Sequence, residues 1–371
     1  MKKVLFVAHV VKKHFMLFHI PYLKWFKENG YETHVCARND YENKEECNIP
    51  YCDKYYDLPF ERFPFKFNNI LVYKELKKII DNNEFDIIHC HTPVGGVLAR
   101  LAARNSRREG TKVIYTAHGF HFFKGASIIN WVLFYPIEKF CARYTDVLIT
   151  INQEDYKRAQ NFKANKIVYV PGVGINTNKF EKLNIDRVKK REMLGILESQ
   201  KILLSVGELS KRKNHEVVIK ALNKLNDPNI VYIICGQGNL DMHLEKKAKE
   251  FNVNLKLLGF RKDILEICRI SDIFVFPSKQ EGLPVAVMEA MASGLPVVCS
   301  DIRGNSDLIS NNVGGYLFKL NDTDMLAHEI SKLIDDKELC IKMAKNNLIK
   351  IKEFDIRNVK IIMEEIYGGK E

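Results

Sequence analysis

The sequence predicts an α/β protein made of two doubly wound domains that face each other across a cleft. Two observations favour this fold class. A length of 371 residues suits two domains that each have their own core. Apolar strand-like runs also alternate with helix-like stretches along most of the chain, as in parallel sheets covered by helices on both faces. Ligands of such sheets bind at the C-terminal ends of the strands, so we expect a ligand site in the cleft.

The first half of the chain opens with an apolar strand at Lys3 to Val10, followed by a helix pattern from Phe18 that Gly30 closes. Further helices are expected at about 94–104, 128–142 and 153–161. The strands expected after the first are Tyr31 to Ala37, Ile87 to His91, Lys112 to Ala117, Val147 to Ile151 and Ile167 to Val170.

A polar connector from Asn176 to about Gln200 separates this series from a second one. We therefore expect one domain at 1–185, another at 186–352 and a C-terminal helix, 353–371, that packs back on the first domain. The second series has helices at about 324–333, 336–349 and 354–366. Its expected strands are Ile202 to Val206, Ile230 to Cys235, Leu255 to Leu258, Ile273 to Phe276 and Pro296 to Ser300.

Cysteine usage and hydropathy favour a cytoplasmic protein. The nine cysteines are scattered singly and form no Cys-x-x-Cys pair, which excludes a disulfide framework. The apolar run Val4 to Val11 is too short for a signal peptide, and no stretch of about eighteen uncharged apolar residues is present to span a bilayer.

The formal net charge of +11 calls for an anionic partner. No helix-turn-helix, zinc-finger or RNA-binding signature supports nucleic acid. Anionic lipid fits better, because aromatic and basic residues are interleaved in Phe60 to Phe67 and in Phe120 to Lys124. We expect peripheral attachment to the inner face of the cell membrane; the alternative is a solvated basic surface over buried phenylalanines. The aromatic stretch Ile128 to Phe140 is more typical of core than of a lipid-binding face.

One segment, 278–300, carries the strongest chemical signal. An apolar strand runs into a polar turn with Glu281 and Gly282, and a helix pattern from Val285 to Ala292 contains Glu289. Backbone amides at a helix start suit a phosphate, and carboxylates suit sugar hydroxyl groups. The turn could therefore seat a sugar joined to a diphosphate. Two surface glutamates on an ordinary strand-turn-helix are an equal alternative.

Three other strand ends in the second series carry glycine or a cation. After Ile202 to Val206 come Gly207 and a cationic loop in which Lys213 could contact a diphosphate. Gly236-Gln237-Gly238 supplies only two glycines of a dinucleotide fingerprint and is weak evidence for NAD. Arg261 could present a flat cation to a base, or lie in solvent.

Together these residues resemble the family-four retaining glycosyltransferases of the GT-B fold, in which two Rossmann-like domains face each other. The resemblance lies in Gly-x-Leu-x-x-x-Lys-Asn from Gly207 and in Phe-Pro-Ser-x-x-Glu-Gly-Leu-Pro-x-x-x-x-Glu-Ala-Met-Ala-Ser-Gly from Phe276, and it is looser in the N-terminal domain. His89-Cys90-His91-Thr92-Pro93 and Tyr115-Thr116-Ala117-His118-Gly119 are similar to the branch that makes bacterial polysaccharides and lipid-linked oligosaccharides.

The resemblance implies an N-terminal acceptor domain and a C-terminal nucleotide-sugar domain. It implies that Glu281 contacts the donor sugar, that Lys213 binds the diphosphate and that His118 lies near the reacting centre. Glu289 would hold the ribose. The residues expected to bind the donor are Glu289, Gly282, Leu283, Pro284, Val285, Arg212, Gly207, Gly236 and Arg261.

Two departures from the family pattern affect these expectations. Glu208 stands where family members commonly carry an arginine, so either Arg212 or Lys211 compensates, or Lys213 and amides hold the diphosphate alone. The first strand is followed by Val10 to Phe15 and not by the glycine pair of many members, which leaves contacts from that loop open.

The implied reaction transfers a sugar from a nucleotide diphosphate, with UDP expected, to a saccharide acceptor with the anomeric configuration retained. The acceptor expected for this branch is linked to a polyprenyl diphosphate. Protein cations and amides would stabilise the leaving diphosphate, so we expect neither a metal requirement nor another cofactor. His89 and His91 resemble a metal-binding pair, but spacing provides no third ligand, and we assign no metal site.

Two other functions stay open at this point. An enzyme like UDP-N-acetylglucosamine 2-epimerase shares the fold but needs no acceptor. A catalytically silent scaffold subunit is suggested only by Glu208.

Overall fold

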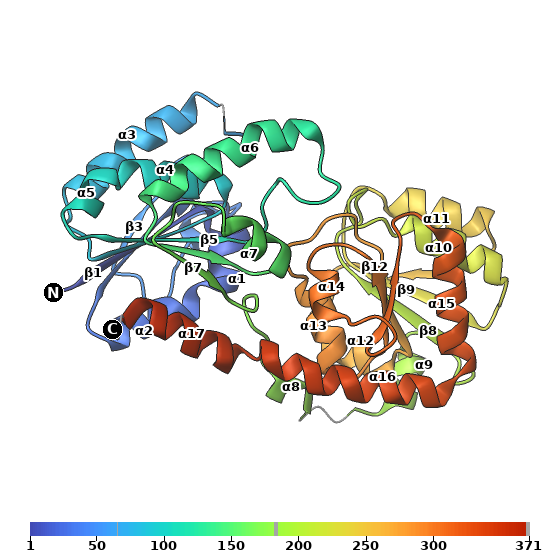
Figure 1. Cartoon of the computed structure of the whole chain (residues 1–371). Coiled ribbons are helices and arrows are strands. Elements are labelled where there is room, and N and C mark those ends of the chain that lie inside the picture. Colours follow the sequence, from blue (N-terminus) through green and yellow to red (C-terminus); the bar gives the residue numbers. More distant parts are fainter. Residues whose placement is uncertain (65, 182–184, 369–371) are drawn as a thin grey trace. The chain divides into compact units, whose positions relative to one another are not determined.

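The computed structural model describes residues 1–64, 66–181 and 185–368. These residues form two compact units, Met1–Val173 and Gly174–Glu371, each built around one parallel sheet (Figure 1). Within the described residues, no helix combines the length and the apolar character needed to cross a membrane. All nine cysteines are free.

The sheet of the first unit has seven parallel strands in the order β3-β2-β1-β4-β5-β6-β7. Its central strands are buried on both faces, which is why they read as continuous apolar runs in the sequence. The register pairs Val4 of β1 with Thr33 of β2 on one side and with Ile87 of β4 on the other. The strands are β1 (Lys3–Val10), β2 (Glu32–Arg38), β3 (Lys54–Tyr56), β4 (Ile87–His91), β5 (Lys112–Ala117), β6 (Val147–Thr150) and β7 (Lys166–Tyr169).

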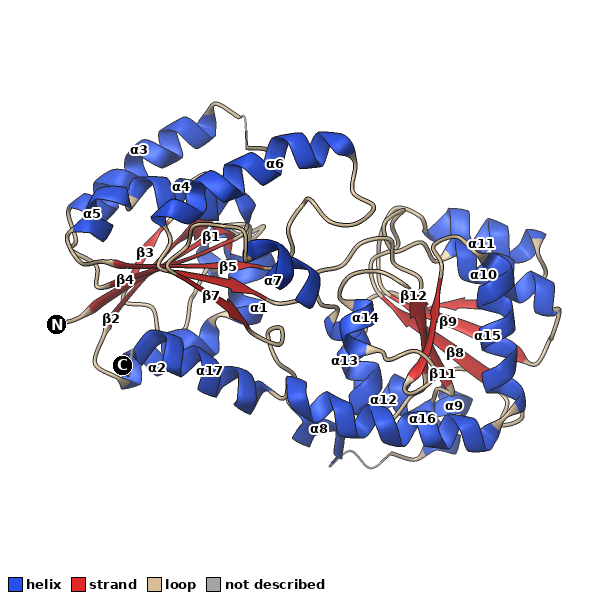
Figure 2. Cartoon of the chain, in the orientation of Figure 1, coloured by secondary structure: helices blue, strands red, loops and turns tan. Residues whose placement is uncertain are grey.

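Helices cover both faces of this sheet (Figure 2). On one face, α4 lies between α3 and α6 over a core that includes Val72, Ala99 and Tyr115. On the other face, α2 packs Phe26 against Phe6 of β1. The helices are η1 (a π-helix, Val11–Phe15), α1 (Met16–Phe18), α2 (Ile20–Glu28), η2 (Lys44–Glu46), α3 (Asn68–Asp81), α4 (Pro93–Ala102), α5 (Arg104–Arg108), α6 (Ile128–Cys141), η3 (Ala142–Tyr144) and α7 (Gln153–Ala159).

The sheet of the second unit has six parallel strands in the order β10-β9-β8-β11-β12-β13. Its register pairs Leu203 of β8 with Tyr232 of β9 and with Ile273 of β11. The strands are β8 (Lys201–Val206), β9 (Ile230–Cys235), β10 (Asn254–Leu257), β11 (Ile273–Phe276), β12 (Val297–Ser300) and β13 (Gly315–Phe318).

Helices α10, α11 and α15 pack on one face of this second sheet, around Val218, Leu244 and Leu326, and α12 and α13 lie on the other face (Figure 2). The helices are α8 (Thr177–Glu181), α9 (Arg187–Met193), α10 (Glu216–Leu225), α11 (Asp241–Glu250), α12 (Ile264–Ile270), α13 (Val285–Ala292), α14 (Asn305–Leu308), α15 (Thr323–Asp335), α16 (Lys337–Lys350), η4 (Ile351–Phe354) and α17 (Ile356–Gly368).

Each strand predicted from the sequence is present, and the helices expected at about 324–333, 336–349 and 354–366 correspond to α15, α16 and α17. The edge strands β3 and β13 were missed, because short edge strands such as Lys54–Tyr56 carry too few residues for a periodic signal. The predicted domain limits at 185 and 352, and the packing of 353–371 on the first domain, stay predictions; residues 182–184 and 369–371 lie outside the described part of the chain.

The aromatic segments proposed for lipid contact divide into two groups. Phe60, Phe120 and Phe122 belong to the core, so the structure contradicts a lipid role for these side chains. Phe63 and Phe67 are 57% and 85% exposed. Phe65 lies outside the described residues. Phe120 and Phe122 are buried because they stack on each other beneath α6, a tertiary arrangement that the sequence alone does not reveal.

Helix α6 has two apolar faces. Its aromatic residues Trp131, Phe134 and Tyr135 pack against the core of the first unit, as the sequence favoured. Ile128 and Val132 point to solvent with 81% and 72% of their surface exposed. The helix therefore contributes to the core and also presents apolar surface.

Candidate functional site

The second sheet has a topological switch point between β8 and β11. The chain proceeds from β8 outward to β9 and β10, then returns to place β11 on the opposite side of β8. In open α/β sheets, ligands bind at such points, beyond the carboxyl ends of the strands. The two segments that leave this position are 207–215 and 277–284, the same segments that carry the predicted donor-site residues.

Close backbone packing shapes the base of the site. A Cβ atom at Gly236 would lie 1.8 Å from the carbonyl oxygen of Gly207, so a side chain there would collide with the neighbouring loop. The amide of Gly207 donates to the carbonyl of Cys235 over 2.9 Å. Glycine at 236 therefore lets the loops after β8 and β9 lie against each other, which explains this predicted glycine on structural grounds.

The loop after β8 presents its cations to the turn after β11. Lys213 extends across the face of Phe276, with its Nζ atom 4.5 Å from the ring centroid. Backbone contact joins the two segments, because the amide of Lys279 donates to the carbonyl of Arg212 over 2.8 Å. Burial lowers the pKa of Lys213, and the charge of Glu281 opposes that shift.

Glu281 is the centre of this arrangement. Its Oε1 atom accepts hydrogen bonds from Nζ of Lys213 at 2.7 Å, from Nη1 of Arg212 at 2.9 Å and from Oγ of Ser278 at 2.6 Å. The side chains of Glu281 and Lys213 are each only 12% exposed. Three of the predicted residues thus meet in one half-buried group with two cations and one carboxylate.

Arg303 is a contributor that sequence reasoning missed. This buried side chain follows β12 and donates from Nε to the backbone carbonyl of Glu281 over 3.0 Å. Next to it, Gly304 has φ +83°, and a Cβ atom there would lie 2.3 Å from the carbonyl oxygen of Gly282. The sequence did contain a signal for this residue, since a cation and a glycine follow a buried strand. Adjacent parallel strands end at the same edge of a sheet, so residues after β12 are expected near those after β11.

The turn leads directly into helix α13. Leu283 and Pro284 are buried, whereas Gly282 and Val285 are partly exposed. The first N–H groups of a helix have no intrahelical acceptors, so the start of α13 can offer donors to an anion.

Glu289 lies one turn into α13 and does not join the Glu281 group. Burial raises the pKa of its carboxyl group to about 6. Within the described residues, its carboxylate has no hydrogen-bond partner. A desolvated carboxylate of this kind is suited to accept hydrogen bonds from ligand hydroxyl groups.

Arg261 forms an ion pair with the neighbouring residue Asp263. Its Nε and Nη2 atoms donate to the two carboxylate oxygens of Asp263 at 2.8 and 2.6 Å, and Asp263 also pairs with Lys190. The side chain of Arg261 is 33% exposed, so part of it is accessible to solvent. Its predicted contact with a base stays a prediction.

Glu208, which stands at the position expected to carry an arginine, lies beside Arg212 at the edge of the site. Its side chain is 60% exposed and lies 3.9 Å from Nη2 of Arg212. Arg212 therefore reaches from the exposed Glu208 to the half-buried Glu281. Of the two cations that could replace the missing arginine, Arg212 is the one that contacts the site.

The predicted residues of the first unit lie at the edge of their own sheet. His91 is the last residue of β4, and His118 follows β5 directly. The Nε2 atom of His118 lies 3.4 Å from Nδ1 of His91, whereas Nε2 of His89 contacts Oγ1 of Thr116 at 2.8 Å. His89 and His91 therefore make different side-chain hydrogen bonds, although their ring centroids lie only 4.0 Å apart.

Comparison with known proteins gives matches to both units. A family model described as "Glycosyl transferases group 1" matches residues 186–348, and one described as "Glycosyl transferase 4-like" matches residues 3–152. "Putative glycosyltransferase EpsD" of Bacillus subtilis (strain 168) is 40% identical over 375 residues, which span 99% of this chain and 97% of that protein.

A second relative is the Escherichia coli "UDP-Gal:alpha-D-GlcNAc-diphosphoundecaprenol alpha-1,3-galactosyltransferase". It is 33% identical over 296 residues, 75% of each chain. Among solved structures, Anabaena Alr3699/HepE in complex with UDP matches with a TM-score of 0.81 at 20% identity and covers 100% of both chains, which shows the GT-B fold. The chain therefore belongs to the family-four glycosyltransferases of the GT-B fold and is a hexosyl- or N-acetylhexosaminyltransferase.

Proposed function

We propose that this protein transfers a sugar from a UDP-sugar to a saccharide carried on a polyprenyl diphosphate, with retention at the anomeric carbon, in the synthesis of a cell-surface polysaccharide. The observation that carries the proposal is the group formed by Arg212, Lys213 and Glu281 at the switch point of the second sheet. It combines two cations for a diphosphate with a carboxylate for sugar hydroxyl groups.

In the proposed mechanism, Lys213 and Arg212 bind the diphosphate and stabilise the charge that develops on it as the sugar leaves. Lys213 is well placed for this work, because a half-buried ammonium interacts with a phosphate more strongly than one in bulk water. Glu281 pairs with both cations in the structure. When a diphosphate binds to these cations, Glu281 would be released in part and could orient the donor sugar.

The remaining donor contacts come from α13 and from the loops that pack beside it. Amides at Gly282, Leu283 and Val285 would face phosphate and sugar, and Glu289 would accept from the ribose hydroxyl groups. His118 would act near the reacting centre on the acceptor side. With these cations and amides in place, we expect the transfer step itself to need no metal bound to the donor diphosphate.

The choice of substrates draws support from relatives. One named relative uses UDP-Gal and an acceptor on diphosphoundecaprenol, and one structural neighbour binds UDP. The arrangement of Lys213 and Arg212 suits any nucleotide diphosphate. UDP is therefore the part of the proposal that most needs a direct test.

A membrane-bound acceptor would be easier to reach from the membrane surface. The first unit exposes apolar residues on α6, on α3 and directly before α3: Phe67, Ile70, Leu71, Ile128, Ile129 and Val132 are each more than half exposed. In the sequence, the exposed Lys66 and Lys74 flank the first three of these residues, and the exposed Lys124 precedes the last three. We propose that this surface contacts anionic lipid on the inner face of the cell membrane.

A thermal-shift panel with UDP, GDP, ADP, CMP and several nucleotide sugars tests the donor class. A ligand that binds only the folded state raises the melting temperature, and we expect the rise with UDP and a subset of UDP-sugars. A rise with GDP or ADP alone would contradict the UDP assignment. If donor alone gave an epimerised nucleotide sugar and no UDP, the protein would not be acting as a transferase.

Co-sedimentation with vesicles tests the membrane contact. We expect more binding to anionic than to neutral vesicles at low salt, and less binding for the double variant Ile128→Glu, Val132→Glu. The matched control is Met242→Glu, because Met242 is 79% exposed but belongs to α11 of the second unit. Equal loss in the control would show that the apolar face of α6 is not the contact.

A further inference from the structure

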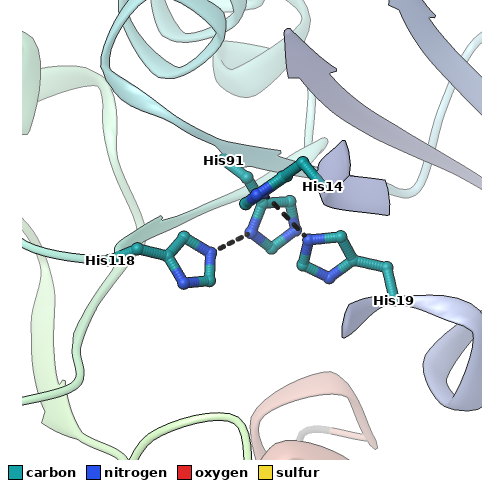
Figure 3. Close-up of side chains that lie close together, drawn as sticks. All are labelled: His14, His19, His91 and His118. Carbon is teal, nitrogen blue, oxygen red and sulfur yellow. Dashed lines mark hydrogen bonds between the residues drawn. The ribbon is translucent and has the colours of Figure 1, made fainter. Parts of the chain in front are cut away.

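Four histidine side chains converge in the first unit, and no step of the proposed transfer uses them together. His14 lies in the π-helix after β1, His19 directly precedes α2, His91 ends β4 and His118 follows β5. Figure 3 shows their rings turned toward one another. The first sheet has its own topological switch point between β1 and β4, so these histidines lie where an open α/β sheet binds its ligand.

The nitrogen atoms have nearly the spacing of a tetrahedral metal site. One nitrogen from each ring can be chosen so that all four lie within 4.8 Å of one another. Nε2 of His14 is 3.3 Å from Nε2 of His19, and Nε2 of His118 is 3.4 Å from Nδ1 of His91. Tetrahedral zinc with Zn–N bonds of about 2.0–2.1 Å needs N···N separations of about 3.3–3.4 Å. Two pairs already have this separation as hydrogen-bond contacts, and the remaining separations, which reach up to 4.8 Å, would have to shorten when a metal binds.

The four rings lie in a desolvated and largely aromatic environment. Burial is the largest cause that lowers the pKa of each of the four rings, and neighbouring imidazoles add to it for His14, His19 and His91. Aromatic rings line the group: Phe6 stacks on His91, and Phe18 lies edge-on to His14. The site is thus a set of imidazole nitrogens in a largely apolar wall.

Unpartnered ring nitrogens are a second, independent sign of an open donor set. His19 and His91 are only 2% and 1% exposed. Nδ1 of His19 and Nε2 of His91 are buried with no hydrogen-bond partner. Buried polar nitrogens are normally satisfied, so these two rings have unused coordinating capacity. The unpartnered atoms are the other ring nitrogens from those in the 3.3 and 3.4 Å contacts, in which His19 uses Nε2 and His91 uses Nδ1. The π-helix that carries His14 is itself a rare element that occurs often at functional sites.

We propose that His14, His19, His91 and His118 bind one transition-metal ion, with Zn²⁺ as the expected ion. Four protein ligands make a closed site of the structural type. Bound metal would hold the segment after β1 against the ends of β4 and β5. The proposal departs from the sequence-based expectation that the chain has no metal site, and it gives His118 the role of a ligand. It does not rest on the proposed transfer reaction, because metal binding is measured directly.

The test uses the full-length chain without a histidine tag, first stripped with a chelator. Titration with ZnCl₂, followed by calorimetry and by elemental analysis after gel filtration, should give one zinc per chain. Zinc should also raise the melting temperature, and Co²⁺ should give the intense visible absorption of a tetrahedral site. A stoichiometry below one tenth of an ion per chain, or octahedral cobalt spectra, would overturn the proposal.

Two ligand variants and one control locate the ion. We expect His14→Asn and His19→Gln each to weaken zinc binding by at least tenfold. His328→Asn should leave binding unchanged, because His328 is an exposed histidine on α15 of the second unit. His14 is half-buried, so its variant should still fold if the buried His19 variant does not. Unchanged zinc affinity in folded His14→Asn would show that the ion binds elsewhere, for example at cysteines.

Discussion

The two switch points of this molecule have the same topology and opposite chemistry. In the second unit, loops after β8 and β11 bring together Lys213, Arg212 and Glu281, which are charged and half-buried. In the first unit, the segments after β1 and at the ends of β4 and β5 bring together four imidazole rings, two of which are buried. The strand order fixes where a ligand can bind, and the side chains at the strand ends lead us to propose a diphosphate for one site and a metal ion for the other.

The largest effect is expected at Glu281. Glu281→Gln keeps the turn, because Arg303 holds the backbone carbonyl of residue 281, but removes the charge between the two cations. We expect turnover to fall roughly 10²- to 10³-fold, about 3–4 kcal/mol of transition-state stabilisation. The free energy of unfolding should fall by less than about 2 kcal/mol.

Steady-state kinetics and melting curves for Glu281→Gln separate these two effects. The control is Glu208→Gln, which changes an exposed carboxylate of the neighbouring loop and should leave turnover within about threefold. A large drop in melting temperature for Glu281→Gln would make the residue structural, and the second switch point would then resemble an ordinary ion-pair network.

A smaller effect is expected at Arg212. Arg212→Ala removes one of the two cations at Glu281 and should weaken UDP binding about ten- to a hundredfold, the effect of one charge-assisted hydrogen bond. Lys211→Ala, which changes an exposed neighbour, should change the dissociation constant less than threefold. Calorimetric titration with UDP measures both.

The Arg212→Ala variant can also show whether an arginine at position 208, where family members commonly carry one, can replace Arg212. Adding Glu208→Arg to Arg212→Ala should recover part of the lost affinity, since the side chain at 208 already reaches Arg212. No recovery would mean that position 208 does not face the diphosphate in this chain.

At Glu289 we expect modest effects of opposite sign: Glu289→Gln should raise stability and weaken UDP binding. Its pKa is raised from 4.5 to about 6, so between these values the folded state keeps a proton that the unfolded state has lost. The carboxyl group's contribution to stability therefore falls as pH rises through this window. At pH 7.5, Glu289→Gln should raise the free energy of unfolding by about 1 kcal/mol after allowance for solvent screening.

Melting curves at pH 5 and pH 7.5 check this sign, and the advantage of Glu289→Gln should shrink at pH 5. Its affinity for UDP should drop about tenfold, because an ionised acceptor for the ribose is lost. A variant that was less stable than the parent at pH 7.5 would show that Glu289 has a stabilising partner in the fold.

The smallest effect is expected at His89, which adjoins the histidine cluster but bonds to Thr116. His89→Gln should leave the zinc dissociation constant within about threefold while lowering the melting temperature, because a buried group is replaced. Loss of zinc binding in folded His89→Gln would add this residue to the ligands.

The sequence by itself determined most of the fold and the charged site. Buried parallel strands are continuous apolar runs, so most of them can be recognised from the local sequence. The turns with Lys213 and Glu281, which follow two of these strands, can be recognised in the same way. A family motif joined these turns across sixty-eight residues, and the structure brings their side chains into contact.

Tertiary structure alone decided the histidine cluster, the place of Arg303 and the burial of Phe120 and Phe122. His14, His91 and His118 lie on segments that only the strand order β2-β1-β4-β5 makes neighbours, and His91 had seemed to pair with His89 because the two are close in sequence. Two residues that are two positions apart on a strand, such as His89 and His91, point to the same face of the sheet. The side chains that each of them contacts, however, also come from neighbouring strands. Contacts between distant segments depend on sheet order, and no local pattern records that order.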